Sequence, residues 1–121
     1  MKNSFLLSGQ GGDGKISRLL QSFPTAPFLQ FGDLMVLPQN LEYQMTYNDG
    51  FIIVDDIDKA SIRILNKFLE LLSLYPNLGI IFVTNNLENV PESIQTRCYA
   101  QYRTEDIDAL IDGVKALNHE V

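Results

Sequence analysis

Short apolar runs alternate with segments of helical periodicity along this chain. Four runs are strongly apolar and are followed by glycine or polar residues: Ser4–Ser8, Pro27–Phe31, Phe51–Val54 and Gly79–Val83. Runs of this length and composition are typical of strands buried in a parallel sheet. The run from Cys98 to Arg103 predicts a further strand close to the end of the chain.

The segments between these runs have the spacing of helices. The pattern predicts a helix from Lys15 to about Phe23, one from about Lys59 to Leu74, a short one around Pro91–Gln95 and a last one capped by Thr104. The expected apolar faces of the second and the last of these helices are Ile62, Leu65, Phe68, Leu69 and Leu72, and Ile107, Leu110, Ile111 and Val114. The stretch from Leu34 to Tyr47 is ambiguous between a helix and a loop.

The alternation predicts the fold class. Strands that alternate with helices favour an α/β domain with a parallel sheet, so residues 1–121 are expected to form one domain in which helices sandwich five parallel strands. Ligands of open α/β sheets bind at the carboxyl ends of the strands. Because polar residues follow several of the predicted strands, the candidate site residues are expected to converge at that edge.

Composition narrows the class of function. Apolar residues make up 45% of the 121 positions, which is enough for a compact core, and no apolar run approaches a membrane span. The net charge of −6 disfavours direct binding to nucleic acid, because phosphate backbones attract basic surfaces. Any link to DNA is therefore expected to run through partner proteins. The single Cys98 cannot form an internal disulfide, and a cytoplasmic location is expected by default.

A glycine-rich segment joins the first predicted strand to the first predicted helix. Residues 9–15, Gly-Gln-Gly-Gly-Asp-Gly-Lys, fit the G-x-x-x-x-G-K part of a phosphate-binding loop. In such a loop, backbone N–H groups point at phosphate oxygens and the lysine adds positive charge. The candidate nucleotide-binding residues are Gly9, Gly11, Gly12, Gly14 and Lys15.

Two positions depart from this pattern. Ile16 stands where a Ser or Thr hydroxyl would bind Mg²⁺, and Ser17 lies about 100° further round the helix. Asp13 places a negative charge close to the expected phosphate. A glycine-rich turn without a ligand is therefore the alternative interpretation of this segment.

Two acids follow the third predicted strand. Residues 52–56, Ile-Ile-Val-Asp-Asp, match a Walker B strand, in which Asp55 would hold Mg²⁺ through water and Asp56 would orient the attacking water. Asp56 is one methylene shorter than the Glu usually found there. The alternative is a buried strand that ends in an exposed acidic loop, residues 55–58.

Two further positions carry candidate catalytic residues. Asn85 follows the fourth predicted strand, where a polar side chain can hydrogen-bond the γ-phosphate or the attacking water. Arg97 lies between the short helix and the last strand, and the planar arginine cation spreads well over phosphate oxygens. The alternatives are a simple turn at Asn85 and a surface arginine paired with a local carboxylate.

In this order the motifs resemble those of AAA+ ATPases, and most closely those of DNA clamp loader subunits. Residues 80–102, IIFVTNNLENVPESIQTRCYAQY, are similar to the segment from sensor 1 to the arginine finger of bacterial delta-prime and gamma subunits, of replication factor C small subunits and of phage clamp loaders. That segment contains a strand, a T-N or similar pair and P-x-x-I-x-S-R-C. Here Thr96 replaces the usual Ser, whereas Arg97 and Cys98 match.

The resemblance implies roles for single residues and a cofactor. Lys15 matches the P-loop lysine and Asn85 matches sensor 1. Asp55 and Asp56 match Walker B, and Arg97 matches the arginine that acts on the next subunit. These matches imply ATP or ADP with Mg²⁺ as cofactor, and other AAA+ or replication proteins as partners in a homo- or hetero-oligomer.

The same resemblance implies a limited activity. Delta-prime subunits combine a degenerate P-loop with a retained arginine finger, as this chain does, so a stator-like role in DNA replication with weak or absent ATP hydrolysis is expected. Clamp loader subunits carry a helical lid and a collar domain after this core, and the bacterial ones hold a four-cysteine zinc insert. Here the chain ends at Val121 and Cys98 is the single cysteine, so an AAA+ core without a lid domain is expected.

Three other interpretations remain open. A viral superfamily 3 helicase core also has paired acids, an asparagine motif and a later arginine, although the region between Asp58 and Gly79 leaves no room for a DNA-tracking hairpin. A DnaA-like ATPase core is similar around residues 55–58. The third is a non-catalytic interaction module that has lost nucleotide binding, which Ile16 and Asp13 both favour. Binding to single-stranded DNA separates helicase from loader, and position 16 separates ATPase from interaction module.

Overall fold

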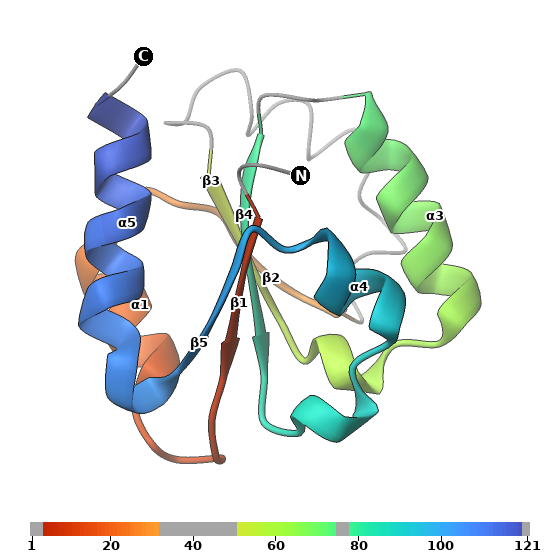
Figure 1. The fold of residues 1–121 in the computed structure, drawn as a ribbon, viewed down its shortest axis with the longest axis horizontal. Helices are drawn as coiled ribbons and strands as arrows, with labels where there is room; N and C mark the ends of the chain where they lie inside the picture. Colours follow the sequence, from red (N-terminus) through yellow and green to blue (C-terminus); the bar gives the residue numbers. More distant parts are fainter. Residues whose placement is uncertain (1–3, 32–50, 75–77, 120–121) are drawn as a thin grey trace.

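The computed structural model describes residues 4–31, 51–74 and 78–119 (Figure 1). Its strands form a single parallel sheet. The strand order is β2-β3-β4-β1-β5, and every neighbouring pair is parallel. The strands are β1 (Ser4–Ser8), β2 (Phe28–Gln30), β3 (Phe51–Asp55), β4 (Gly79–Thr84) and β5 (Ala100–Arg103). The predicted five-stranded parallel sheet is confirmed, whereas the ambiguous stretch 34–47 lies outside the described residues.

Helices cover both faces of this sheet. They are α1 (Lys15–Ser22), α3 (Ile62–Ser73), α4 (Glu92–Arg97) and α5 (Ile107–His119), with short 3₁₀ turns η2 (Ile57–Lys59), η3 (Leu87–Asn89) and η4 (Thr104–Asp106). Figure 1 shows α1 and α5 on one face and α3 and α4 on the other. The predicted sandwich of helices around the sheet is confirmed. Within the described ranges, no helix is both long enough and apolar enough to cross a membrane.

Alternation along the central strands divides the core in two. Successive side chains of a strand point to opposite faces of a sheet, so Leu6 packs toward α3 and α4 while Phe5 and Leu7 pack toward α1 and α5. In β4 all six residues are buried. Because both faces are covered, the sheet is a rigid support for the loops at the carboxyl ends of its strands.

The long helix begins later than its periodicity predicts. Lys59 lies in η2, and α3 starts at Ile62, because Ser61 is its N-cap and accepts a hydrogen bond from Ile64 N at 3.2 Å. Ile62 therefore stands in the first turn, where it is 69% exposed rather than part of the apolar face. The other four residues of that predicted face, Leu65, Phe68, Leu69 and Leu72, are buried.

Two other predicted helix boundaries are wrong, and the last strand, β5, starts at Ala100 rather than at Cys98. Thr104 is not the cap of the last helix but the first residue of η4, and α5 starts at Ile107. Its hydroxyl is engaged elsewhere, since Thr104 Oγ1 donates to Asp13 Oδ2 at 2.6 Å. The short helix α4 ends at Arg97 instead of Gln95, so the candidate arginine belongs to the helix rather than to the connection after it.

Candidate functional site

The glycine-rich loop lies at the carboxyl end of β1 and leads directly into α1. Gly12 and Gly14 have φ angles of 78° and 82°, in the left-handed region that favours glycine. Gly9 N donates to Thr84 O at 3.1 Å, which fixes the start of the loop to the end of β4. The sequence therefore forms the strand–loop–helix context that a phosphate-binding loop requires.

Lys15 is buried inside this loop although it carries a charge. The residue is 4% exposed, and its ammonium donates to Gln10 O at 3.0 Å and to Asp13 Oδ1 at 3.2 Å. A third, short hydrogen bond joins Lys15 Nζ to Asn85 Oδ1 at the end of β4. The structure therefore brings together two of the predicted site residues, Lys15 and Asn85, from positions 70 apart in the sequence.

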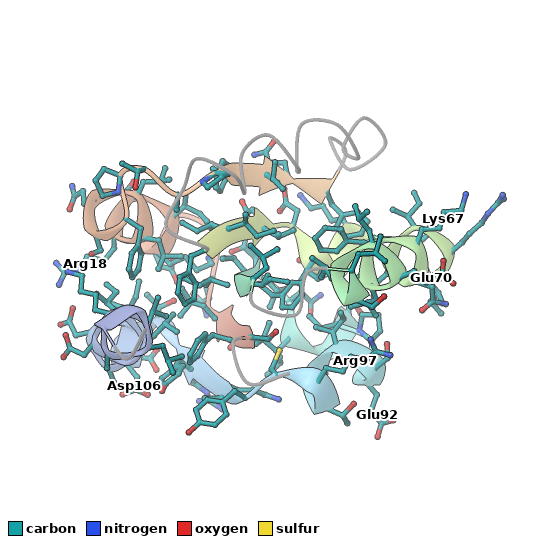
Figure 2. All side chains as sticks on the ribbon, turned by 90° about the horizontal axis from the view of Figure 1, so that it is seen from above. Arg18, Lys67, Glu70, Glu92, Arg97 and Asp106 are labelled. Atoms are coloured by element: carbon teal, nitrogen blue, oxygen red, sulfur yellow. The ribbon has the colours of Figure 1, made fainter. Side chains whose placement is uncertain are left out.

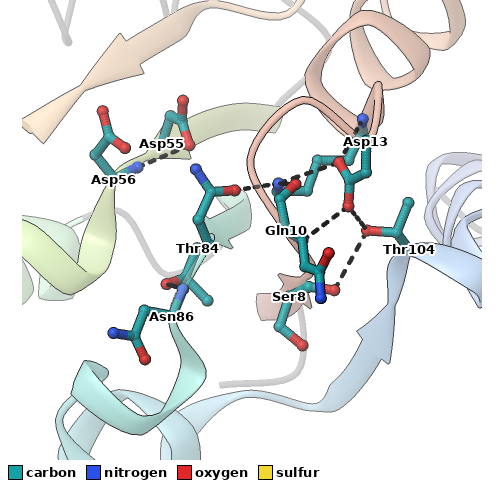
Figure 3. A network of polar contacts seen from close by, with 10 residues as sticks. Ser8, Gln10, Asp13, Asp55, Asp56, Thr84, Asn86 and Thr104 are labelled. Carbon is teal, nitrogen blue, oxygen red and sulfur yellow. Dashed lines mark hydrogen bonds and ion pairs between the residues drawn. The ribbon is translucent and has the colours of Figure 1, made fainter.

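Asp13 is the hub of the polar network in the loop (Figure 3). Its Oδ2 accepts from Gln10 N at 3.0 Å and from Thr104 Oγ1 at 2.6 Å, and its Oδ1 accepts from Lys15 N at 3.2 Å. Burial alone would raise the pKa of Asp13, but the hydrogen bonds that it accepts outweigh burial and lower its pKa from 3.8 to about 2. The carboxylate is therefore ionised at neutral pH.

This lowered pKa predicts a pH window for stability. A carboxyl whose pKa is lower in the folded state stabilises the fold above its unfolded pKa of 3.8 and loses that contribution as pH falls through about 2. We expect the difference in unfolding free energy between wild type and Asp13→Asn to be constant above about pH 5 and to shrink toward pH 2. Urea denaturation of both proteins at several pH values measures it, and a difference that does not vary with pH would contradict the assignment.

The two acids predicted to form a Walker B motif, Asp55 and Asp56, lie at the end of β3, at the same edge of the sheet. Asp55 is half-buried, and its Oδ1 accepts from Asp56 N at 2.8 Å. Burial raises the pKa of Asp55, while the backbone hydrogen bond and the charge of Lys15 lower it in part. Asp56 has a φ of 59°, and its carboxylate pairs with Lys59 Nζ at 3.4 Å. Figure 3 shows both acids on the opposite side of Thr84 from Asp13.

Two residues of the polar network at this edge of the sheet, Asp58 and Thr104, are not among the site residues predicted from the sequence. Asp58 accepts a hydrogen bond from the buried Thr84 Oγ1 at 2.7 Å, and Thr84 Oγ1 in turn accepts from Asn86 N at 3.0 Å. This pair fixes the turn that presents Asn85. The acidic run 55–58 was a weak signal for Asp58. The sequence around Thr104 indicates a helix cap, and no local signal marks its contact with Asp13 across 91 positions.

The donor set does not fit the usual Mg²⁺ site of a phosphate-binding loop. Ile16, at the position of the Ser or Thr hydroxyl, packs against the core between the sheet and helices α1 and α5. Asp55 supplies one carboxylate. Among the described residues, no group of three His, Cys, Asp or Glu side chains could hold a metal ion. Of the two expected side-chain ligands, the hydroxyl at position 16 is absent and the carboxylate of Asp55 is present. Metal binding at Asp55 stays a prediction.

Arg97 is not brought to the loop of its own chain. It is the last, exposed residue of α4 (Figure 2), and two residues later Tyr99 N donates to Ser4 O at 2.7 Å. This contact lies at the start of β1, whereas the glycine loop follows its end. Arg97 and Lys15 therefore lie toward opposite ends of the same strand.

A groove opens beside the loop. It has a volume of about 350 Å³ and lies between the start of α1 and the start of α5, with Lys15, Thr104 and Ile107 in its lining. Arg18 and Asp108, also in the lining, form a short salt bridge between these two helices. The groove has room for a small ligand next to the glycine-rich loop.

Comparison with known proteins identifies the fold. No family model matches the sequence, and no curated protein matches it. Among solved structures, the chain is similar to the FIGL-1 AAA domain in complex with ADP, at 22% identity and a TM-score of 0.65, covering 84% of this chain and 42% of that one. It is also similar to a chain from a structure on katanin self-assembly, at 23% identity and a TM-score of 0.63, covering 84% and 40%. The chain thus spans less than half the length of these solved chains, and it has the α/β fold of AAA domains.

Proposed function

We propose that this chain, which has an AAA+ fold, is a nucleotide-binding module that holds the phosphates of ATP or ADP at residues 9–15. The observation that carries the proposal is the buried ammonium of Lys15, which lies inside the glycine loop and contacts Asn85 at the end of β4. A lysine in this position supplies positive charge to phosphate, and the amide beside it supplies a hydrogen-bond donor. The ADP bound by the FIGL-1 AAA domain supports the same class of ligand.

The same geometry favours slow hydrolysis. Asp56 is the residue proposed to orient the attacking water, but its carboxylate pairs with Lys59 and its backbone is left-handed. Ile16 offers no hydroxyl, and the carboxylate of Asp13 competes with a phosphate for Lys15. We therefore expect a module that binds nucleotide and turns it over slowly by itself.

Arg97 is proposed to act on the nucleotide of a neighbouring subunit. Its place toward the opposite end of β1 from the loop excludes a role at its own site without a large rearrangement. A planar cation from a neighbour can stabilise charge that develops on phosphate during hydrolysis. The structural likeness to a protein studied for katanin self-assembly supports an oligomer in which such a contact forms.

Arg97→Ala tests this role in trans. We expect ATP turnover that rises with protein concentration in wild type to fall by at least about 10-fold in the variant, because arginines of this kind contribute 10³-fold or more. ADP affinity and thermal stability should stay unchanged. Steady-state ATPase assays over a range of concentrations measure the first, and calorimetry measures the other two.

Arg63→Ala is the matched control, since Arg63 is an exposed arginine on α3. It should leave turnover unchanged. A large loss of thermal stability in Arg97→Ala, with ADP affinity and turnover altered together, would identify Arg97 as part of a structural ion pair instead.

We propose further that this module acts in DNA replication. This part of the proposal rests on residues 80–102 and their resemblance to clamp loader subunits, whereas the two solved structures compared above are a FIGL-1 AAA domain and a chain from a structure on katanin self-assembly. The net charge of −6 supports contact with DNA through partners. Tight, salt-sensitive binding of the chain to single-stranded DNA would count against this part and favour a helicase-like core.

A non-catalytic interaction module is the second candidate function. The observation that favours it is the loop itself, in which Asp13 already pairs with Lys15 and the partly buried Ile16 packs against the core. Titration calorimetry with ADP separates the two functions. Binding in the micromolar range supports the nucleotide-binding module, and no heat at millimolar ADP supports the interaction module.

A further inference from the structure

The carboxylate of Asp13 occupies hydrogen-bond donors that a phosphate would need. It accepts from Gln10 N at 3.0 Å, from Lys15 N at 3.2 Å and from Lys15 Nζ at 3.2 Å. These donors are two backbone N–H groups of the loop and its lysine ammonium, the kinds of group that hold phosphate in loops of this class. The loop is therefore already closed around an anion that belongs to its own chain.

A distant residue fixes this arrangement. Thr104 Oγ1 donates to Asp13 Oδ2 at 2.6 Å, which links the loop to the end of β5. Gly9 leaves the space for this pair, since a Cβ there would lie 2.0 Å from Thr104 Oγ1 and 2.2 Å from Asp13 Oδ2. The first glycine of the loop thus serves the contact between Asp13 and Thr104.

We infer that Asp13 is an internal competitor of the nucleotide, and that polyphosphate binds only by displacing this carboxylate from Lys15 and Gln10. The inference rests on the proposed function and extends it, because it names the residue that sets affinity for the phosphates. The competitor is charged at neutral pH, since the pKa of Asp13 is about 2. Removal of its charge should therefore increase phosphate affinity while it weakens the unliganded loop.

Titration calorimetry with ADP and with pyrophosphate tests the inference on wild type, Asp13→Asn and Thr104→Val. We expect Asp13→Asn to bind both probes at least about 10-fold more tightly, because charge-assisted hydrogen bonds to Lys15 pass from the side chain to the ligand. Thr104→Val, which keeps the charge of Asp13 but loosens its anchor, should gain about 3-fold. Asp13→Asn without ligand should also unfold at lower urea than wild type.

Asp106→Asn is the matched control, because it removes one carboxylate charge from η4, near Thr104. If Asp106→Asn gained as much affinity as Asp13→Asn, the tighter binding would be explained by net charge alone, and the inference would be overturned. A gain for ADP without one for pyrophosphate, or unchanged or weaker binding in Asp13→Asn while wild type binds ADP, would also overturn it; these results leave the proposed function standing. Absence of binding by every variant at millimolar ADP would overturn the proposed function and the inference with it.

Discussion

Lys15→Ala is expected to weaken ADP binding by at least about 30-fold, because loss of one partner of a hydrogen-bonded charge pair, here the Lys15 ammonium and a phosphate, costs about 2–5 kcal/mol. The ammonium is 4% exposed and holds Asp13, Asn85 and the carbonyl of Gln10 at once. Its loss removes the positive charge from the proposed phosphate site and takes one hydrogen-bond donor away from each of these acceptors. Titration calorimetry with ADP, on wild type and variant at one ionic strength, measures the change.

Lys67→Ala is the control for charge alone. Lys67 is an exposed lysine on α3, which covers the other face of the sheet from α1 (Figure 2). The control should bind ADP as wild type does. If Lys15→Ala retained wild-type affinity, the nucleotide would bind somewhere other than the glycine loop, and the proposed site would be wrong.

Leu6→Ala is expected to lower the free energy of unfolding by about 2–5 kcal/mol, the range for a leucine truncated in a well-packed core. Leu6 is fully buried in β1, between β4 and β5, and its side chain packs toward α3 and α4. A cavity at this point has rigid strands on both sides, so the surroundings can relax little. Urea denaturation monitored by circular dichroism measures the loss.

Leu74→Ala makes the same chemical change at a residue that is 70% exposed. It should alter the unfolding free energy by no more than about 0.5 kcal/mol. Equal losses for Leu6→Ala and Leu74→Ala would mean that β1 is not an interior strand of a packed sheet.

Much of the fold could be predicted from the sequence because apolar runs and helical spacing are local signals. The five strands and the sandwich of helices follow from them. Strand order does not, since it depends on pairs such as Phe5 with Ile81 that no local pattern encodes. The misplaced Ile62 has a similar cause: its spacing fits the apolar face, but the cap at Ser61 places it in a first turn exposed to solvent.

The candidate site was predictable in its parts and not in its connections. The glycine loop, the acids after β3 and Asn85 stand out because each follows a strand, and the structure places them at one edge of the sheet. The hydrogen bonds of Asp13 were not predictable, because one donor, Thr104, lies 91 positions away and looked like a helix cap. Asp13, which departs from the pattern of a phosphate-binding loop, is therefore the centre of the polar network in the glycine-rich loop.

The place of β1 inside the sheet, between β4 and β5, also governs how the chain can fold as it is made. Ser4 pairs with Ile80 and Phe5 with Ala100, so both partners of the first strand are synthesised long after it. Contacts between such distant positions form slowly, because the intervening chain must first be ordered. During translation, the apolar side chains Phe5, Leu6 and Leu7 of β1 therefore lack their strand partners until residues 79–103 have been made. In this interval β1 exposes apolar surface, and the yield of folded protein in cells should depend on chaperones that shield such segments.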